Sequence, residues 1–512
     1  MGRHRGRRHA SALVLGAVLL ALPAAPGTAG VEHTTGDTRV RLSGWLDVWN
    51  VIRLHDDTRH EDPSTTLSLA FQATHAERFR LVARVDAGFD GKVGNPSGSN
   101  PVLPIDEIYT NRDLFLDFDE VYLETFLENV EVRIGAQKVS WGQLDEIQPT
   151  DHLNPEDQTE FFFRPELERK IAVPGLRLLG FQGPWTIDFV WNPVHIAYRF
   201  PNERDRWFPP LLAVPDVVDT SLGAVPARTR YLDLDRPART LAHSDVGVRL
   251  TRFWRGGEFS LSLFHGFDKT ATFGARTTAD VSPTGNPAAP VDIRADIEIF
   301  PTLHRITALG FDMAIPVWLL ALRAEVAWIT GRFHSTLLQE ELTSGEGALQ
   351  VVEEAAMRVA AGGSAERVDV PLGAAALERD MLHYGVGIDF VISELLSERL
   401  VGTTALAGSF ILLQLLEEVI FDHDERLIVN AVEHSLGFTY RQSFFDERLR
   451  GELKLAYIPN HGDYYVWPQV TYKIRPRCHL LLGARIIGGT RTQRVGQYRD
   501  HDGVRLGLRV FL

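Results

Sequence analysis

Short segments in which apolar and polar residues strictly alternate recur along this 512-residue chain, and they constrain its fold more than any other feature. In the segment VEVRIGAQ, residues 130–137, the valines, Ile134 and Ala136 fall on one face, whereas Glu131 and Arg133 fall on the other. Alternation with a period of two is typical of a β-strand with one apolar and one polar face. The chain therefore repeats a strand whose two faces meet different surroundings.

We expect about 18 such strands, and 16 remains an alternative count. The expected ranges are 39–52, 65–75, 78–90, 114–126, 129–138, 169–181, 184–193, 244–253, 257–266, 303–315, 317–330, 381–392, 400–412, 428–442, 448–458, 464–474, 477–487 and 503–512. Every second connection is short, and the intervening ones, such as 91–113 and 194–243, are mostly long. Strands of about ten residues with connections that alternate in this way are the sequence signature of an outer-membrane β-barrel. The predicted fold is all-β: a transmembrane, antiparallel, up-and-down β-barrel with short periplasmic turns and long extracellular loops.

Two tryptophans mark the height of the band that is expected to face lipid. Trp318 and Trp328 bracket four apolar residues on one face of a single expected strand. Ten residues at ~3.3 Å each, tilted by ~40°, project to roughly 25 Å along the membrane normal, which is the height of such a band. Aromatic residues at both rims are typical of interfacial girdles. This face is therefore predicted to contact lipid.

Both ends of the chain agree with export to the outer membrane of a Gram-negative bacterium. Four arginines precede an apolar run at 10–22 and a small-residue site ending at Ala29. This pattern predicts a secretory signal peptide over 1–29 and a single barrel domain over 30–512. The final segment alternates to the end, with Phe511 penultimate and Leu512 last. It resembles the last-strand signal that the outer-membrane assembly machinery reads, although the final residue of that signal is usually aromatic.

The charge of the chain is negative, but alternation places many basic residues on the inner faces of the strands. The chain has 53 basic and 67 acidic residues, a formal net charge of −14, and the surplus acids are expected in extracellular loops such as 142–170 and 417–425. The candidate pore-lining residues are Arg80, Arg84, Arg133, Arg249, Arg323, Glu325, Arg450, Glu452, Lys454, Arg485, Arg505 and Arg509. Two interpretations stay open: the bases attract anionic solutes, carboxylates among them, or they pair with acids across neighbouring strands and fill the interior.

A polar segment after the strand at 130–137 carries a recognisable pattern. Its candidate functional residues are Trp141, Gly142, Asp145, Asp151, Asn154, Pro155 and Asp157. Asn154 and Pro155 are expected to fix a turn, and the aspartates are expected to cap backbone N–H groups. Two interpretations stay open here as well: a loop that stiffens the barrel wall, or a gate for a solute.

Together with the Trp-x-Pro end of the strand at 185–193, this pattern resembles the proteobacterial outer-membrane family known as domain of unknown function 1302. The specific match covers about sixty residues, 137–193. The resemblance implies an outer-membrane barrel with a suspected role in transport and no established substrate.

The connection 331–380 differs from the others because residues 348–363 lack alternation and are rich in helix formers. We expect a short helix that ends at Gly362–Gly363. It would either fold into the mouth of the barrel and narrow it, or lie over the rim. Narrowing of the mouth is the favoured prediction.

The sequence contains no persuasive enzyme motif, and we expect neither enzymatic activity nor a cofactor. GxSxG, HExxH, CxxCH, P-loop and GxGxxG patterns are absent from suitable contexts. The carboxylates of Asp117, Asp119 and Glu120 leave calcium binding open as a minor alternative, but no metal site is predicted.

The leading functional hypothesis is an outer-membrane channel or transporter for small solutes, anionic or amphipathic ones included. One alternative is the outer-membrane component of a system that exports or inserts a lipid or another hydrophobic molecule. The other is a structural or adhesive barrel. The expected partners are outer-membrane lipid and lipopolysaccharide, the assembly machinery, a small-molecule solute and, as an open point, a periplasmic protein; no nucleic acid is expected.

Overall fold

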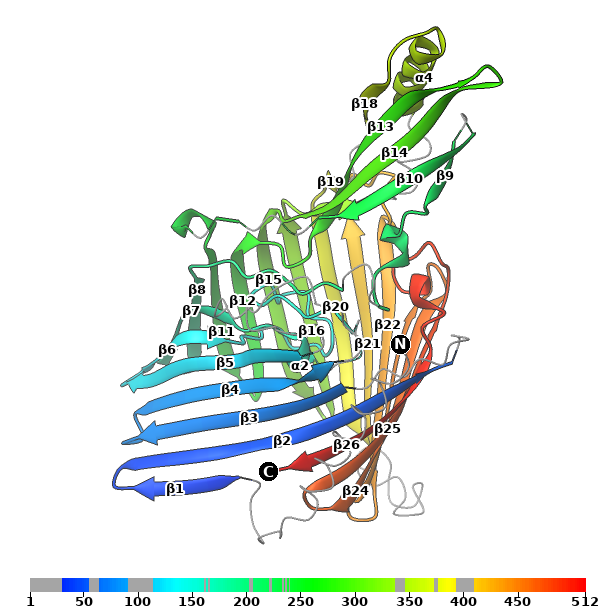
Figure 1. The fold of residues 1–512 in the computed structure, drawn as a ribbon. Coiled ribbons are helices and arrows are strands. Elements are labelled where there is room, and N and C mark those ends of the chain that lie inside the picture. Colours follow the sequence, from blue (N-terminus) through cyan, green and yellow to red (C-terminus); the bar gives the residue numbers. More distant parts are fainter. Residues whose placement is uncertain are drawn as a thin grey trace.

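The barrel predicted from the sequence is present and closed. The computed structural model describes residues 30–54, 64–90, 114–160, 163, 166–201, 206–220, 223–232, 234, 237–238, 240–336, 346–372, 376–392 and 409–512. Within these residues, 18 antiparallel strands pair in sequence order around one ring (Figure 1), which confirms the fold class and the larger strand count. The expected signal peptide, 1–29, lies outside the described residues.

The barrel strands are β2 (Thr38–Arg53), β3 (Ser64–His75), β4 (Phe79–Asp90), β5 (Leu114–Leu127), β6 (Val130–Gln137), β7 (Val173–Gln182), β8 (Trp185–Asn192), β11 (Asp245–Trp254), β12 (Gly257–Phe267), β15 (Arg305–Val317), β16 (Leu320–Thr330), β20 (Met381–Val391), β21 (Phe410–Ile420), β22 (Val432–Phe444), β23 (Leu449–Ile458), β24 (Asp463–Arg475), β25 (Cys478–Gly488) and β26 (Gly503–Phe511). The last strand pairs with the first, from Trp45–Phe511 to Arg53–Gly503, and closes the ring. A short strand, β1 (Val31–Thr35), pairs with the start of β2.

Tight turns gather at one end of the barrel, as the sequence predicted. Two residues connect β5 to β6, β7 to β8, β11 to β12, β15 to β16 and β24 to β25. Trp318 belongs to one of these turns and not to a strand, which corrects its predicted position. Its φ of 57° is the left-handed conformation that two-residue hairpin turns require. Its side chain is 81% exposed at the rim.

One predicted strand is displaced. The segment 400–412 was expected to be a strand, but β21 runs from Phe410 to Ile420, and 400–408 lies outside the described residues. Alternation fails here because Leu412 and Leu416 are buried on the inner face while Leu413 is exposed on the outer face. Glu417 and Glu418 therefore lie in β21 and not in an extracellular loop. The bounds of the other barrel strands agree with the prediction to within four residues.

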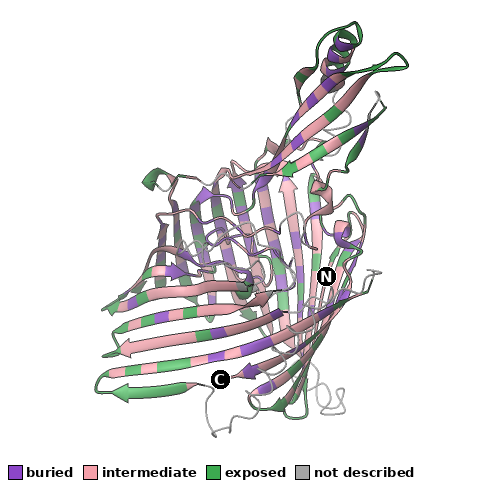
Figure 2. Ribbon diagram, in the orientation of Figure 1, coloured by how far each residue is buried: buried purple, intermediate pink, exposed green. Residues whose placement is uncertain are grey.

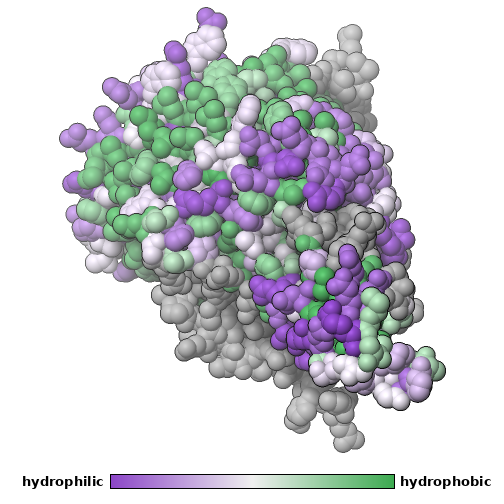
Figure 3. Space-filling view, turned by 90° about the horizontal axis from the view of Figure 1, so that it is seen from above, coloured by the Kyte–Doolittle hydropathy of each residue, from purple (hydrophilic) through white to green (hydrophobic). Residues whose placement is uncertain are grey.

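The two faces of the barrel strands have opposite character. In β12, Leu261 and Leu263 are 57% and 49% exposed on the outside, whereas Ser260 and Ser262 are buried inside. Buried and exposed positions alternate in this way along many strands (Figure 2). In the view from above, hydrophobic side chains gather over one broad part of the surface and hydrophilic ones over another (Figure 3). Among the described residues, no helix is both long enough and apolar enough to cross a membrane.

Three long connections combine into a second structure that projects beyond the barrel (Figure 1). It is a five-stranded sheet in the order β18 (Glu366–Val370), β13 (Thr272–Asn286), β14 (Ala289–Thr302), β10 (Gly223–Tyr231), β9 (Val217–Thr220). Helix α4 (Glu346–Ala360) packs on it through Val352, Ala355 and Val359. We call these five strands and α4 the loop module; sequence analysis treated its sheet as loops.

The predicted helix in 331–380 is therefore present as α4, but the prediction that it narrows the mouth is wrong. Its buried side chains contact Ala279 and Val281 of β13 in the projecting sheet. The apolar face of the helix is covered by that sheet, so the helix is held away from the lumen (Figure 1).

The opposite character of the strand faces predicts a large difference between adjacent positions on β23. Leu453 faces outward between Tyr440 and Pro468, whereas Glu452 and Lys454 line the interior. We expect Leu453→Arg to lower the free energy of unfolding by roughly 2–4 kcal/mol, the cost of arginine near the bilayer midplane. Urea titration of the protein in lipid vesicles measures this. The inward-facing control Arg450→Gln on the same strand should cost less than about 1 kcal/mol; equal costs would contradict the assignment of faces.

The core of the loop module predicts that the module unfolds separately from the barrel. The side chain of Ala355 is fully buried, so Ala355→Asp places an unpaired carboxylate among apolar groups at a cost of about 3 kcal/mol or more. We expect limited proteolysis to cut the module in this variant while the barrel keeps its heat-dependent gel mobility. Met357→Asp, on the exposed side of the same helix (64% exposed), is the matched control. Loss of the folded barrel in the Ala355 variant would contradict the prediction.

Candidate functional site

The described residues of 138–172, between β6 and β7, lie inside the barrel, and we call them the lumen segment. Sequence analysis placed 142–170 in an extracellular loop with surplus acids, and that prediction is wrong. Hydrogen bonds and ion pairs join this segment to β8 and to the more distant strands β16, β23 and β25. The segment that we expected to face water outside the barrel therefore lies inside it.

Glu325 of β16 is the strongest attachment point for the lumen segment. Its buried carboxylate accepts hydrogen bonds from the backbone N–H groups of Gln143, Leu144 (2.6 Å) and Thr150 (3.2 Å), and from the Thr150 hydroxyl (3.0 Å). Buried backbone N–H groups require such partners. Glu325, predicted to line the pore, instead binds the segment that narrows it.

Gly142 allows the chain to approach that carboxylate. Its φ is +102°, a conformation that side chains disfavour. A Cβ atom at this position would lie 2.7 Å from Oε1 of Glu325. The Trp-Gly pair of the motif therefore has a steric reason: glycine is required where the lumen segment meets β16.

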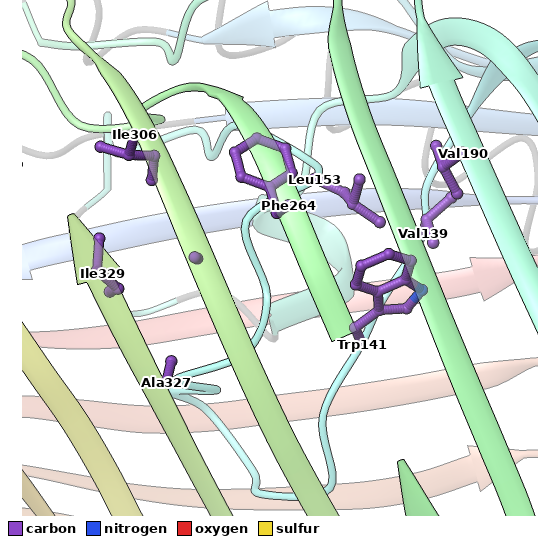
Figure 4. Packing of buried hydrophobic residues seen from close by; sticks show 9 residues of the cluster. Val139, Trp141, Leu153, Val190, Phe264, Ile306, Ala327 and Ile329 are labelled. Carbon is purple, nitrogen blue, oxygen red and sulfur yellow. The ribbon is translucent and has the colours of Figure 1, made fainter. Parts of the chain in front are cut away.

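Trp141 packs the lumen segment against the adjacent barrel wall. Its indole N–H donates to Asp188 of β8 at 3.0 Å, and Asp188 also accepts two hydrogen bonds from Arg177. The ring packs in an apolar cluster with Val139 and Leu153 of the segment and inward-facing residues of the wall (Figure 4). The wall residues of that cluster are Val190, Phe264, Ile306, Ala308, Ala327 and Ile329. On this side the lumen is filled by packed protein.

Asn154 joins the two ends of the lumen segment. Its amide N–H₂ donates to the carbonyls of Gln137 (3.1 Å) and Ile171 (2.7 Å), and its side-chain oxygen accepts from the N–H of Val139 (2.8 Å). The carbonyl of Pro155 accepts from the N–H of Ile171. The Asn-Pro pair thus closes the base of the segment beside the ends of β6 and β7.

The aspartates of the motif have separate tasks. Asp151 and Asp157 accept from the N–H groups two residues ahead, at 3.4 and 3.0 Å, as expected of caps. Asp151 also pairs with the buried Lys170. Asp145 lies near Arg323, and burial raises the pKa of its carboxyl above the ordinary value.

The far side of the lumen segment is attached to the opposite wall. Glu146 pairs with Lys454 of β23, and Glu160 pairs with the buried Arg485 of β25 at 3.3 Å. The Arg485 guanidinium lies 4.8 Å from the ring centre of Phe163. The segment therefore crosses the interior and is held on both sides.

The predicted pore-lining bases are largely paired within the wall. The pairs are Arg80 with Glu124, Arg84 with Glu120 (3.2 Å), Arg133 with Glu124 (2.7 Å), Arg249 with Asp312 (2.6 Å), Arg323 with Asp389 (2.9 Å), Arg450 with Glu452 (3.3 Å) and Arg509 with Asp47 (2.7 Å). Asp117, Asp119 and Glu120 likewise pair with Arg199, Lys138 and Arg84. Pairing of charges inside the barrel is thus observed, in line with the second of the two interpretations.

A cavity of about 680 Å³ remains between the lumen segment and the wall. Its wall residues come from β2 to β6 and from β23 to β26, the side away from the apolar cluster around Trp141. Six predicted pore-lining residues lie on it: Arg84, Arg133, Glu452, Lys454, Arg505 and Arg509. Arg505 stacks on Trp49 at 3.7 Å. The other six candidates hold the wall together or bind the lumen segment.

Sequence reasoning missed the residues that the lumen segment adds to this cavity. Glu160, Phe163, Glu168, Arg169 and Lys170 line it. A signal was present in the inward-facing positions of β12, β15 and β16, where Phe264, Ile306 and Ile329 are apolar. Apolar residues on the inner face of a strand indicate that protein, and not water, covers them.

Comparison with known proteins gave structural resemblances only. No family model and no curated protein sequence matches the chain. OpdK of Pseudomonas aeruginosa, solved with vanillate, is similar at a TM-score of 0.45 and 11% identity, covering 94% of this chain and 100% of that one. OccAB1 of Acinetobacter baumannii is similar at 0.45 and 9%, covering 92% and 96%. OccK5 (OpdH) of Pseudomonas aeruginosa gives 0.43 and 10%, covering 92% and 98%. Similarities at this level carry no argument about solutes.

The close contact between Gly142 and Glu325 predicts that a side chain at position 142 would displace the lumen segment. We expect Gly142→Ala to displace the lumen segment from β16, because the methyl group would overlap the Glu325 carboxylate. The unfolding free energy should fall by about 1–3 kcal/mol, the cost of unpaired buried donors. Single-channel conductance should rise and become noisier.

Gly451→Ala is the matched control, because no heavy atom lies within 4 Å of the added methyl group. It should leave stability and conductance unchanged. Identical behaviour of the two variants would show that the Glu325 contact does not position the segment.

Proposed function

We propose that the protein is an outer-membrane channel for small solutes, amphipathic and anionic ones included. The observation that carries the proposal is a cavity of about 680 Å³ inside a closed 18-strand barrel, beside an internal segment that narrows but does not fill the lumen. A volume of this order suits one small molecule. Exposed leucines on the outer faces suit contact with lipid.

The contacts of the lumen segment favour a fixed constriction over a moving gate. Buried partners hold it at Glu325, Asp188 and Arg485. Release of these contacts would leave buried charges and N–H groups unpaired, at several kcal/mol in total. Solute selection would therefore depend on the shape and charge of the remaining cavity.

The family resemblance of 137–193 to domain of unknown function 1302 is part of the same proposal. Four residues of the motif attach or close the lumen segment: Trp141, Gly142, Asn154 and Asp157. These contacts concern the internal segment and do not specify the solute. Lipid, lipopolysaccharide, the assembly machinery and a periplasmic protein remain proposed partners.

Planar-bilayer recording of the purified, heat-modifiable protein tests the proposal. We expect small, discrete conductance steps with few closures, because the constriction is fixed. A protein that stays closed but purifies with lipid or a periplasmic partner would favour the lipid-export alternative. A closed protein without either would favour a structural or adhesive barrel.

A further inference from the structure

We propose that Arg252 and Arg255, at the periplasmic rim of the barrel, bind the phosphate of an anionic phospholipid from the surrounding leaflet. The inference concerns the outer surface of the barrel and does not depend on which solute passes through its interior. It follows from two arginines that lie beside apolar, lipid-facing residues and have no carboxylate to pair with.

Arg252 faces outward from β11, close to the end of the barrel that carries the two-residue turns. Strand register places it between Trp185 of β8 and Phe259 of β12, and Gln182 of β7 follows Trp185 in the same row. Leu261, the next outward position of β12 toward the middle of the membrane, is 57% exposed. Arg252 therefore lies where the apolar, lipid-facing band of the barrel ends.

Arg255 lies in the turn between β11 and β12, three residues after Arg252. Its φ of 50° and the φ of 82° at Gly256 are the left-handed conformations of a two-residue hairpin turn. The guanidinium carbon of Arg255 lies 4.8 Å from the ring centre of Trp254. That of Arg252 lies 5.0 Å from the ring centre of Trp185. Both guanidinium groups are thus held against exposed indole rings of the kind that form an interfacial girdle.

In the described part of the chain, neither of these two arginines has a carboxylate partner. Acids of the neighbouring strands point into the barrel: Asp188 of β8 pairs with Arg177, and Glu258 of β12 accepts a hydrogen bond from Gln143 of the lumen segment. An arginine on the lipid face raises the energy of the folded protein unless a negative group compensates its charge. At the rim of a bilayer, the phosphates of the lipid head groups supply that charge.

An anionic phospholipid fits both parts of this surface. Its phosphate accepts the planar, two-point hydrogen bonds that a guanidinium donates, and its acyl chains can lie along the exposed leucines of β12. Phospholipid forms the periplasmic leaflet of a Gram-negative outer membrane, whereas lipopolysaccharide forms the outer leaflet. A zwitterionic phospholipid carries a positive group next to its phosphate, and two arginines repel that group. Clustered basic residues beside a membrane therefore prefer anionic head groups.

Native mass spectrometry of the full-length protein, released from detergent with one added lipid at a time, tests the proposal. The probes are phosphatidylglycerol and phosphatidylcholine with identical acyl chains. We expect phosphatidylglycerol to bind about fivefold more tightly. Arg252→Gln combined with Arg255→Gln should reduce this preference to less than about twofold. The corresponding double lysine variant should keep a preference of about threefold, because lysine retains the charge but not the two-point geometry.

Arg78→Gln combined with Arg448→Gln is the matched control, because it removes the same charge from two separate turns of the same rim. It should keep the full preference. Heat-dependent gel mobility verifies that every variant is folded. An equal loss of preference in the control would show diffuse attraction to the rim, and equal binding of both lipids by the wild type would show no site; either result overturns the inference. Competition by soluble glycerol 1-phosphate would indicate a site for free phosphate and would overturn the assignment to lipid.

Discussion

Closure of the backbone hydrogen-bond ladder is the constraint on which the rest of this structure depends. A strand surrounded by hydrocarbon has no water to bond with, so each N–H and C=O must find a partner on a neighbouring strand. The chain meets this condition where β26 pairs with β2 over nine residue pairs. A closed ring then fixes which face of every strand points outward. Alternation in sequence is the direct consequence of that geometry.

Closure also creates an interior that the wall cannot fill. A ring of 18 strands is wider than the side chains on its inner faces can span. The lumen segment occupies part of that space, and its backbone then needs polar partners of its own. Glu325 supplies them to Gln143, Leu144 and Thr150, and Asn154 supplies them at the base. One wall is covered by an apolar core, and the opposite wall borders the cavity.

Most charged side chains inside the barrel are likewise paired with a side chain of opposite charge. A barrel wall with many arginines need not carry a large field, because most of them bind carboxylates at 2.6–3.3 Å on the same strand, on a nearby strand or on the lumen segment. Such pairs keep buried charges satisfied and stiffen the wall. The selectivity of the interior then depends on the few groups left uncompensated. Neither the net charge of the chain nor the number of basic residues on the inner faces therefore predicts this selectivity.

The sequence by itself determined the barrel, the inward or outward direction of most strand residues and the presence of a short connection after every second strand, because a period of two is a local property of the chain. It also determined the helix in 346–360 and the capping roles of Asp151 and Asp157, which depend on neighbours within a few residues. Only the tertiary structure decided that the described residues of 138–172 enter the lumen and that α4 does not. Trp141 meets Asp188 and Leu144 meets Glu325 across 47 and 181 residues. Alternation assigns a residue to the inner face, but it does not say whether water, an ion-pair partner or another segment of the chain will cover it.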